Sequence, residues 1–209
     1  MITNKNIAET IALDLLNIKA VKISPDNLFT WASGIKAPIY TDNRKIVSYP
    51  KMRSLVAQQL ANLIKEQFPN ATVIAGVATA GIPHAALVAH LLELPMIYVR
   101  PKPKDHGTSQ QIEGELPKNA EVVMIDDLIS TGQSVLKAAD VVKAADATVA
   151  GIVSIFDYEL SISSENFEKY GAKFYSVTSY TSLIKAAEEN KLISKAQYLA
   201  IKDWHHTVK

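Results

Sequence analysis

Residues 122–134 read Val-Val-Met-Ile-Asp-Asp-Leu-Ile-Ser-Thr-Gly-Gln-Ser, and this stretch decides the fold. Its first four residues form a short apolar run, which is typical of a strand buried on both faces of a parallel sheet. The strand is expected to end at Ile125, directly before the carboxylates Asp126 and Asp127, and a hydroxyl-rich turn then leads into a helical pattern. Ligands of open α/β sheets bind where the strands end, and a helix N-terminus there offers N–H groups to a phosphate. The stretch therefore predicts acceptors for sugar hydroxyls beside a phosphate cradle, which together fit a ribose 5-phosphate.

Each half of this stretch also occurs in proteins without such a ligand, because an acidic pair can be ordinary loop chemistry and Ser-Thr-Gly-x-Ser an ordinary helix cap. The whole string of thirteen residues, however, resembles the phosphoribosyl-diphosphate (PRPP) signature of the type I phosphoribosyltransferases. This resemblance implies that Asp126 and Asp127 hold the ribose hydroxyls and take part in catalysis. It also implies that the following residues wrap the 5-phosphate: Leu128, Ile129, Ser130, Thr131, Gly132, Gln133 and Ser134.

Composition limits the classes of function that remain. With 209 residues, the chain is long enough for one sizeable core and a small accessory lobe. The 22 basic residues are balanced by 21 acidic ones, which gives no support for a nucleic-acid or membrane surface. There is no cysteine, so disulfides and thiolate metal sites are excluded. No basic-then-apolar leader pattern and no long apolar run is present, and we expect a cytoplasmic protein.

Strand and helix patterns alternate along most of the chain, which predicts a central parallel sheet flanked by helices on both faces. The predicted strands are 72–77, 95–99, 121–125, 148–156 and 173–177, and the predicted helices are 4–19, a segment opened by Pro50, 83–92, 135–145, 164–170, 182–189 and 194–204. We expect a PRPP-binding core over 50–178. A small hood lobe over 1–49 is expected to have the C-terminal helices of 179–209 packed nearby, so that the chain is effectively a single domain.

A second informative stretch is the polar segment 100–117, which is long for a loop without structure of its own and is therefore either functional or disordered. Its first seven residues carry four cationic groups, Arg100, Lys102, Lys104 and His106. The pattern R-x-K-P-K-D-H-G…I-E-G resembles the mobile catalytic loop of orotate phosphoribosyltransferases. The resemblance implies that Arg100, Lys104 and His106 contact the diphosphate of PRPP. Lys104 would act in the transition state, as cations aimed at developing charge do.

Two further motifs match the same family. Residues 29–44, FTWASGIKAPIYTDNR, have no helical period and are expected to form short strands and turns. They resemble the family's orotate-binding hood, and the orotate site implied is Ser130, Lys36, Tyr40 and Arg44. For Trp31, packing at the lobe edge and stacking on the base remain open alternatives. Residues 76–81, GVATAG, lack the Lys-Ser/Thr of a Walker motif but resemble the family's diphosphate-binding turn, often cis in relatives, in which Thr79 and Ala80 present N–H groups. A tight turn without a ligand is the alternative there.

The resemblance covers nearly the whole chain and implies an orotate phosphoribosyltransferase of pyrimidine biosynthesis. The implied substrates are orotate and PRPP, with Mg²⁺ arriving on the PRPP diphosphate rather than in a protein cage. It also implies a homodimer in which loop 100–114 reaches the neighbouring active site. Two competing functions are a transferase for a purine or uracil and a non-enzymatic PRPP sensor. The hood and the catalytic-loop pattern speak against the first, and the lack of a basic patch speaks against the second.

Overall fold

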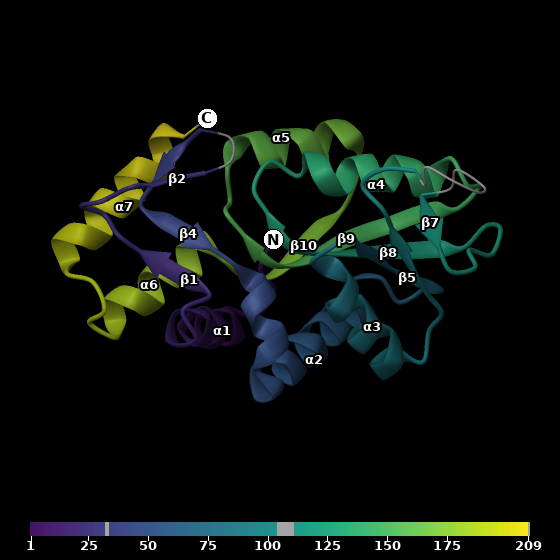
Figure 1. Ribbon diagram of the computed structural model, residues 1–209, viewed down its shortest axis with the longest axis horizontal. Helices are drawn as coiled ribbons and strands as arrows, with labels where there is room; N and C mark the ends of the chain where they lie inside the picture. Colours follow the sequence, from purple (N-terminus) through teal and green to yellow (C-terminus); the bar gives the residue numbers. More distant parts are fainter. Residues whose placement is uncertain (32–33, 104–110, 209) are drawn as a thin grey trace.

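A six-stranded sheet forms the centre of the protein (Figure 1). The computed structural model describes residues 1–31, 34–103 and 111–208. The strand order is β10-β9-β8-β5-β6-β7, in which every neighbouring pair is parallel except β6 and β7. The predicted parallel α/β sheet is therefore confirmed, with one short antiparallel strand added at its edge.

The elements follow the predicted order with small shifts at their ends. The strands are β1 Val21–Ile23, β2 Phe29–Thr30, β3 Lys36–Ala37, β4 Ile39–Thr41, β5 Val73–Val77, β6 Met96–Val99, β7 Ile112–Glu113, β8 Glu121–Ile129, β9 Thr148–Asp157 and β10 Phe174–Ser179. The helices are α1 Lys5–Asn17, α2 Pro50–Gln67, α3 Gly81–Leu92, α4 Gln133–Lys143, α5 Ser161–Tyr170, α6 Tyr180–Glu189 and α7 Lys195–Thr207, and a 3-10 helix covers Asn43–Ser48.

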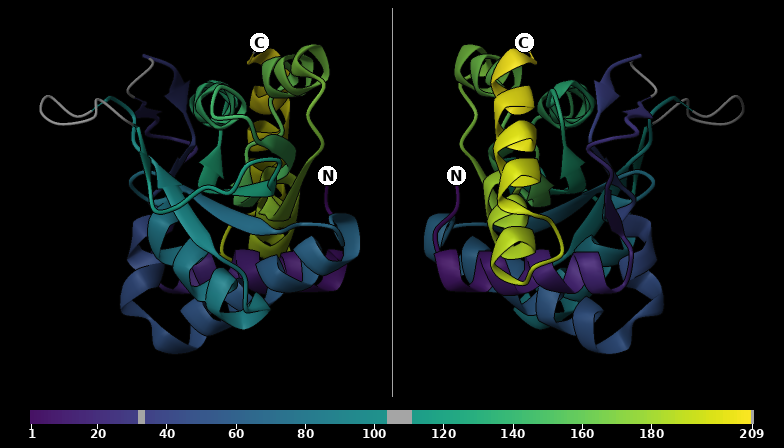
Figure 2. Two further views of the ribbon diagram at one scale, coloured as in Figure 1. Left: turned by 90° about the vertical axis from the view of Figure 1, so that its right-hand side faces the viewer. Right: turned by 90° about the vertical axis from the view of Figure 1, so that its left-hand side faces the viewer.

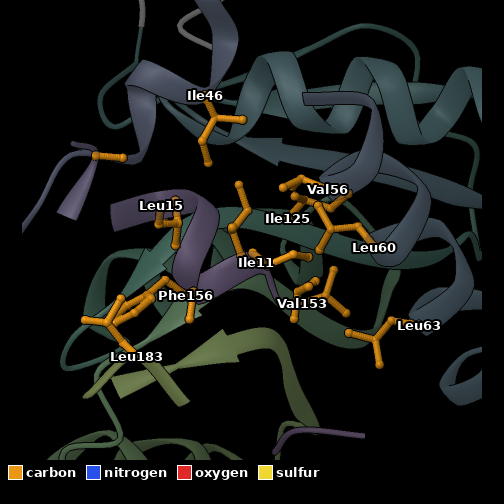
Figure 3. Packing of buried hydrophobic residues seen from close by; sticks show 14 of the residues in the cluster. Ile11, Leu15, Ile46, Val56, Leu60, Leu63, Ile125, Val153, Phe156 and Leu183 are labelled. Atoms are coloured by element: carbon orange, nitrogen blue, oxygen red, sulfur yellow. The ribbon is translucent and has the colours of Figure 1, made fainter. Parts of the chain in front are cut away.

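Helices cover both faces of the sheet because its strands are apolar on both sides. Successive residues of a strand point to opposite faces. Val123 and Ile125 of β8 therefore join the core beneath α1, α2 and α3, whereas Val122 and Met124 join the core beneath α4 and α5. Figure 1 shows α4 and α5 on one side of the sheet and α2 and α3 on the other. The first core is packed by branched aliphatic side chains, among them Ile11, Val56 and Leu60 (Figure 3).

The strand with the acidic pair is longer than predicted, and this corrects the sequence reading. β8 does not end at Ile125 but continues through Asp126 and Asp127 to Ile129. The reason is the neighbouring strand, since Asp126 of β8 pairs with Ser154 of β9 and Leu128 with Phe156. The acidic pair therefore lies within the last part of a paired strand rather than in the loop after it.

Two short strands were not predicted. β1 pairs with β4, and β7 pairs with β6 inside the segment that was expected to lack structure of its own. Neither strand exceeds three residues, which is too short to show a clear alternation in the sequence. Each is formed because a partner strand lies alongside it.

A small lobe stands at one end of the sheet, and Figure 2 views the molecule from that end and from the opposite one. Two antiparallel pairs, β1 with β4 and β2 with β3, form its strands, and α7 packs against them through a hydrogen bond from Trp204 Nε1 to Lys36 O of 2.9 Å. The predicted limits of the lobe and the core stay a prediction. None of the described helices is long and apolar enough to cross a membrane.

Candidate active site

The predicted ligand groups meet at one edge of the sheet. Because β5, β6 and β8 are parallel neighbours, their carboxyl ends lie side by side. The turn with Thr79 and Ala80 follows β5, Arg100 follows β6, and Asp126 and Asp127 lie near the end of β8. The topology thus brings three of the four sequence motifs to the same edge, which is where open α/β sheets bind ligands.

The acidic pair is largely buried and electrostatically strained. Asp126 is 8% exposed, and one of its carboxylate oxygens, Oδ1, accepts the backbone N–H of Asp127 at 2.9 Å. Burial raises the pKa of Asp126 well above its usual range, and the charge of Asp127 raises it further. Burial also raises the pKa of Asp127. Two adjacent carboxylates in this setting favour a ligand that donates hydrogen bonds or brings positive charge.

Asn43 is a functional candidate that the sequence reading missed. Its side chain is 1% exposed and donates from Nδ2 to the backbone carbonyl of Asp127 at 2.7 Å. This bond ties the 3-10 helix, which follows the lobe strands, to the acidic pair on β8. Asn43 and Asp127 are 84 residues apart in the chain, so no local pattern could have indicated the contact.

The turn from β8 into α4 leaves helix N–H groups free. Gly132 has φ +75°, and a Cβ placed on it would lie 2.9 Å from the Phe167 ring, so a side chain there is both strained and crowded. Asn166 Nδ2 donates to Thr131 O at 2.8 Å and holds the turn from α5. No side chain of the described residues caps the start of α4, and an uncapped helix N-terminus can bind a phosphate.

The turn after β5 has the shape that the family resemblance implies. The peptide bond between Ala78 and Thr79 is cis, although neither residue is proline. α3 begins at Gly81, where an added Cβ would collide with the carbonyl oxygen of Ile125. Glycine therefore allows α3 to start directly against β8, beside the acidic pair. No side chain caps the N-terminus of α3 either.

Arg100 is held at the start of the polar loop by backbone and side-chain contacts. Its N–H donates to Gln111 O at 2.8 Å, Gln111 Nε2 donates to its carbonyl at 3.1 Å, and Arg100 Nη1 lies 3.8 Å from Glu113 Oε1. The strand β7 thus pins the base of the loop to the sheet. Lys104 and His106, the other two predicted loop residues, lie outside the described residues.

The predicted orotate residues of the lobe are spread over three elements. Lys36 on β3 and Tyr40 on β4 are exposed, with the ring of Tyr40 5.8 Å from that of Phe29. Arg44 forms an ion pair with Asp42, at 2.6 Å between Nε and Oδ1, and its charge lowers the pKa of Asp127 against the effect of burial. The charge of Arg44 is thus felt by Asp127, although the two side chains form no ion pair among the described residues.

Trp31 packs within the lobe, which favours the packing alternative over stacking on a base. Its indole N–H donates to Ile39 O at 2.9 Å, and its ring lies 4.5 Å from Tyr158 and 6.0 Å from Trp204. Tyr158 was not predicted. Its hydroxyl donates to Thr41 Oγ1 at 2.8 Å, and its carbonyl lies 2.7 Å from Nε2 of His205, so it joins the end of β9 to the lobe and to α7.

Other titratable groups lie near this edge without a part in the motifs. His84 of α3 is fully buried, and within the described part of the chain neither of its ring nitrogens has a hydrogen-bond partner. Burial lowers the pKa of His84 to about 4 and raises the pKa of Asp157, at the end of β9, to about 6. Among residues 1–31, 34–103 and 111–208, no group of three or more His, Asp or Glu side chains is arranged to hold a metal ion.

Comparison with known proteins gives a consistent result in sequence. A family model described as the phosphoribosyl transferase domain matches residues 43–191. The chain is 53% identical to the orotate phosphoribosyltransferase of Levilactobacillus brevis over 197 residues, which is 94% of each chain. It is 49% identical to that of Lactococcus lactis subsp. cremoris, again over 94% of each chain.

Solved structures agree with this result. The orotate phosphoribosyltransferase of Aeropyrum pernix is similar with a TM-score of 0.72 at 28% identity, and the match covers 84% of this chain and 97% of that one. The UMP synthase of Leishmania donovani is similar with a TM-score of 0.82 at 28% identity. That match covers 97% of this chain but 43% of the other, so this chain spans less than half the length of the UMP synthase.

Proposed function

The chain belongs to the orotate phosphoribosyltransferase family, and we propose that it transfers the 5-phosphoribosyl group of PRPP to orotate. The products are orotidine 5′-monophosphate and diphosphate, in the biosynthesis of pyrimidine nucleotides. The observation that carries the proposal is the acidic pair on β8, in which Asp126 is buried and Asp127 is half-buried. The pair lies shortly before the N-terminus of α4, which no side chain of the described residues caps. These are the two features that a ribose 5-phosphate needs.

The reaction replaces one bond at the anomeric carbon by another. The bond from this carbon to a diphosphate oxygen breaks, and a bond to a ring nitrogen of orotate forms. That nitrogen gives up its proton, which passes to the departing diphosphate or to water. The protein's part is then positioning and charge stabilisation. Asp126 and Asp127 would hold the ribose hydroxyls, and the free N–H groups at the start of α4 would hold the 5-phosphate. Arg100, with Lys104 and His106, would stabilise the negative charge that develops on the departing diphosphate.

Mg²⁺ is part of the proposal as an ion that enters with the diphosphate. This ion keeps several waters and prefers substrate phosphates to a cage of protein ligands. The acidic pair supports its presence, because a cation near two carboxyls whose pKa values are raised relieves their repulsion. When bound, Mg²⁺ supplies neutralising charge to the diphosphate.

Orotate would bind on the lobe side of the acidic pair. Lys36 and Arg44 offer cationic groups for its carboxylate, and Tyr40 and Ser130 lie on the neighbouring strand and turn. The proximity of the Arg44 charge to Asp127 supports this placement. We also propose that the reaction takes place in the cytoplasm.

A panel of acceptor bases tests the proposed reaction. Protein incubated with PRPP and Mg²⁺ is expected to consume orotate and to leave adenine, guanine, hypoxanthine and uracil unchanged, because only orotate carries a carboxylate for Lys36 and Arg44. Chromatography of the products measures each reaction. Turnover of a purine or of uracil in preference to orotate would identify a different transferase, and PRPP binding without turnover of any base would identify a sensor.

We also propose a homodimer in which loop 100–114 closes over the neighbouring site. Lys104→Ala and Asp127→Asn subunits should each retain only a small residual activity when alone, and this residual activity is subtracted from that of the mixture. If Lys104 serves the partner's site, a mixed dimer has one intact site and one that lacks both residues. Random exchange makes about half of the dimers mixed, and each mixed dimer has one working site of two. Roughly a quarter of the wild-type activity should therefore return. Co-refolding the two variants at equal concentration and assaying orotate consumption measures this. If gel filtration confirms that mixed dimers have formed but no activity returns, the loop serves its own subunit.

A further inference from the structure

A cavity of about 300 Å³ lies above the carboxyl ends of β5 and β6, beside α4. Its wall includes Ala78 after β5, Arg100 after β6, Gln111 before β7, and Gln133, Ser134 and Lys137 of α4. Five of these six belong to segments that the family motifs already assign to PRPP or to its loop. Lys137 does not, since it stands on the second turn of α4, beyond the signature that ends at Ser134.

The cavity carries an excess of positive charge. Arg100 and Lys137 both line it, and the carboxylate of Glu113 lies 3.8 Å from Arg100. Among the described residues, no acidic side chain forms an ion pair with Lys137. Asp140, one turn further along α4, instead accepts the Tyr170 hydroxyl at 2.7 Å. The helix dipole gives Lys137 no compensation either, because cations are favoured at the opposite end of a helix. Lys137 is exposed to solvent, so its charge is available to an anionic ligand that enters the cavity.

The position of the cavity indicates which anion would fill it. It extends from Gln133 and Ser134, at the start of α4 where the 5-phosphate would bind, to Ala78 and Arg100 after β5 and β6. None of its described lining residues belongs to β8, where the acidic pair would hold the ribose. A ribose held by β8 with its 5-phosphate at the start of α4 would direct its diphosphate toward β5 and β6. The cavity thus faces the part of PRPP that leaves in the reaction.

We propose that Lys137 is a further diphosphate-binding residue, which acts with Arg100 on PRPP and on the diphosphate product. This inference rests on the proposed function, because it takes its ligand from that reaction. A lysine ammonium is a compact charge on a flexible stem that binds phosphate as a point charge, whereas the Arg100 guanidinium adds a planar fork. The two cations line the same cavity from different elements, α4 and the segment after β6.

Direct binding of diphosphate tests the proposal without any need for turnover. Isothermal titration with magnesium diphosphate is expected to show a dissociation constant roughly tenfold higher for Lys137→Gln than for the wild type, the size of one lost charge-assisted contact. Lys137→Arg keeps the charge and should bind nearly as the wild type does. Lys65→Gln is the matched control, since it removes an exposed lysine from α2 on the opposite face of the sheet.

Steady-state kinetics provide the second measurement. The Lys137→Gln variant should show a raised KM for PRPP and weaker inhibition by diphosphate, while its KM for orotate stays at the wild-type value. Two results would overturn the role of Lys137. One is a Lys137→Gln variant that binds diphosphate as tightly as the wild type does, and the other is a wild type that binds no diphosphate. If the Lys137→Gln variant binds diphosphate more weakly than the wild type but the wild type does not consume orotate, the role of Lys137 stands. The proposed reaction is refuted instead.

Discussion

Asp127→Asn is expected to lower kcat/KM for PRPP roughly ten- to a hundredfold, because a hydrogen bond to a charged acceptor contributes about 1.5–3 kcal/mol. The amide keeps the shape of the carboxylate, and its oxygen still accepts a hydrogen bond, but the charge that strengthens the bond to a ribose hydroxyl is gone. Initial rates over a range of PRPP concentrations measure the loss.

The same variant should fold at least as stably as the wild type. The contacts of Asp127 that hold β8 are made by its backbone, whose N–H donates to Asp126 and whose carbonyl accepts from Asn43. Removing one of two adjacent negative charges also relieves the repulsion that raises the pKa of Asp126. Thermal unfolding then separates a lost ligand contact from a damaged fold.

Asp203→Asn is the matched control, because it removes the same charge from an exposed position on α7. Its kinetics with PRPP and orotate should equal those of the wild type. An Asp127→Asn variant with wild-type kinetics would remove the acidic pair from the reaction, and with it the observation on which the proposed function depends.

The second large effect concerns His84 and acid stability. Its imidazole has a pKa of about 4 in the folded protein against 6.5 in the unfolded chain. Above pH 6.5 the group is neutral in both states. As the pH falls from 6.5 to about 4, the unfolded chain takes up a proton that the folded protein refuses, so the free energy of unfolding decreases by roughly 3 kcal/mol from this group alone.

His84→Leu should remove this loss, because leucine has nearly the same volume and needs no hydrogen-bond partner. Urea unfolding of both proteins between pH 8 and pH 4.5 measures the difference. Asp157, whose raised pKa of about 6 gives stability as the pH falls, acts in the opposite direction, but it is present in both proteins and cancels. Unfolding free energies that keep a constant difference across this range would contradict a protonation role for His84.

The order of strands and helices could be predicted from the sequence because each core element carries its own periodicity. The limits of β8 could not. Two aspartates reduce the strand propensity of 126–129, and only pairing with Ser154 and Phe156 of another strand extends it. The small strands β1 and β7 likewise depend on pairing with another strand, β4 and β6 respectively.

The motif residues of the site could be predicted because short stretches carry them, and the structure brings Thr79, Arg100 and Asp127 to one edge. The residues that hold the motifs in place could not. Asn43 reaches Asp127 across 84 residues, and Tyr158 reaches Thr41 across 117. Such contacts leave no local pattern. The assignments of Lys104 and His106 stay predictions, because both lie outside the described residues.

The bond between Trp204 and Lys36 has a consequence for how the protein is made. It joins residues that are 168 positions apart, and His205 beside it holds Tyr158. The central strands all precede residue 180 and are released from the ribosome before α7 has emerged. The lobe strands precede the central sheet in the chain, whereas α7, which is tied to them, follows it. The sheet edge can therefore be assembled on a nascent chain before α7 emerges and completes the lobe over it.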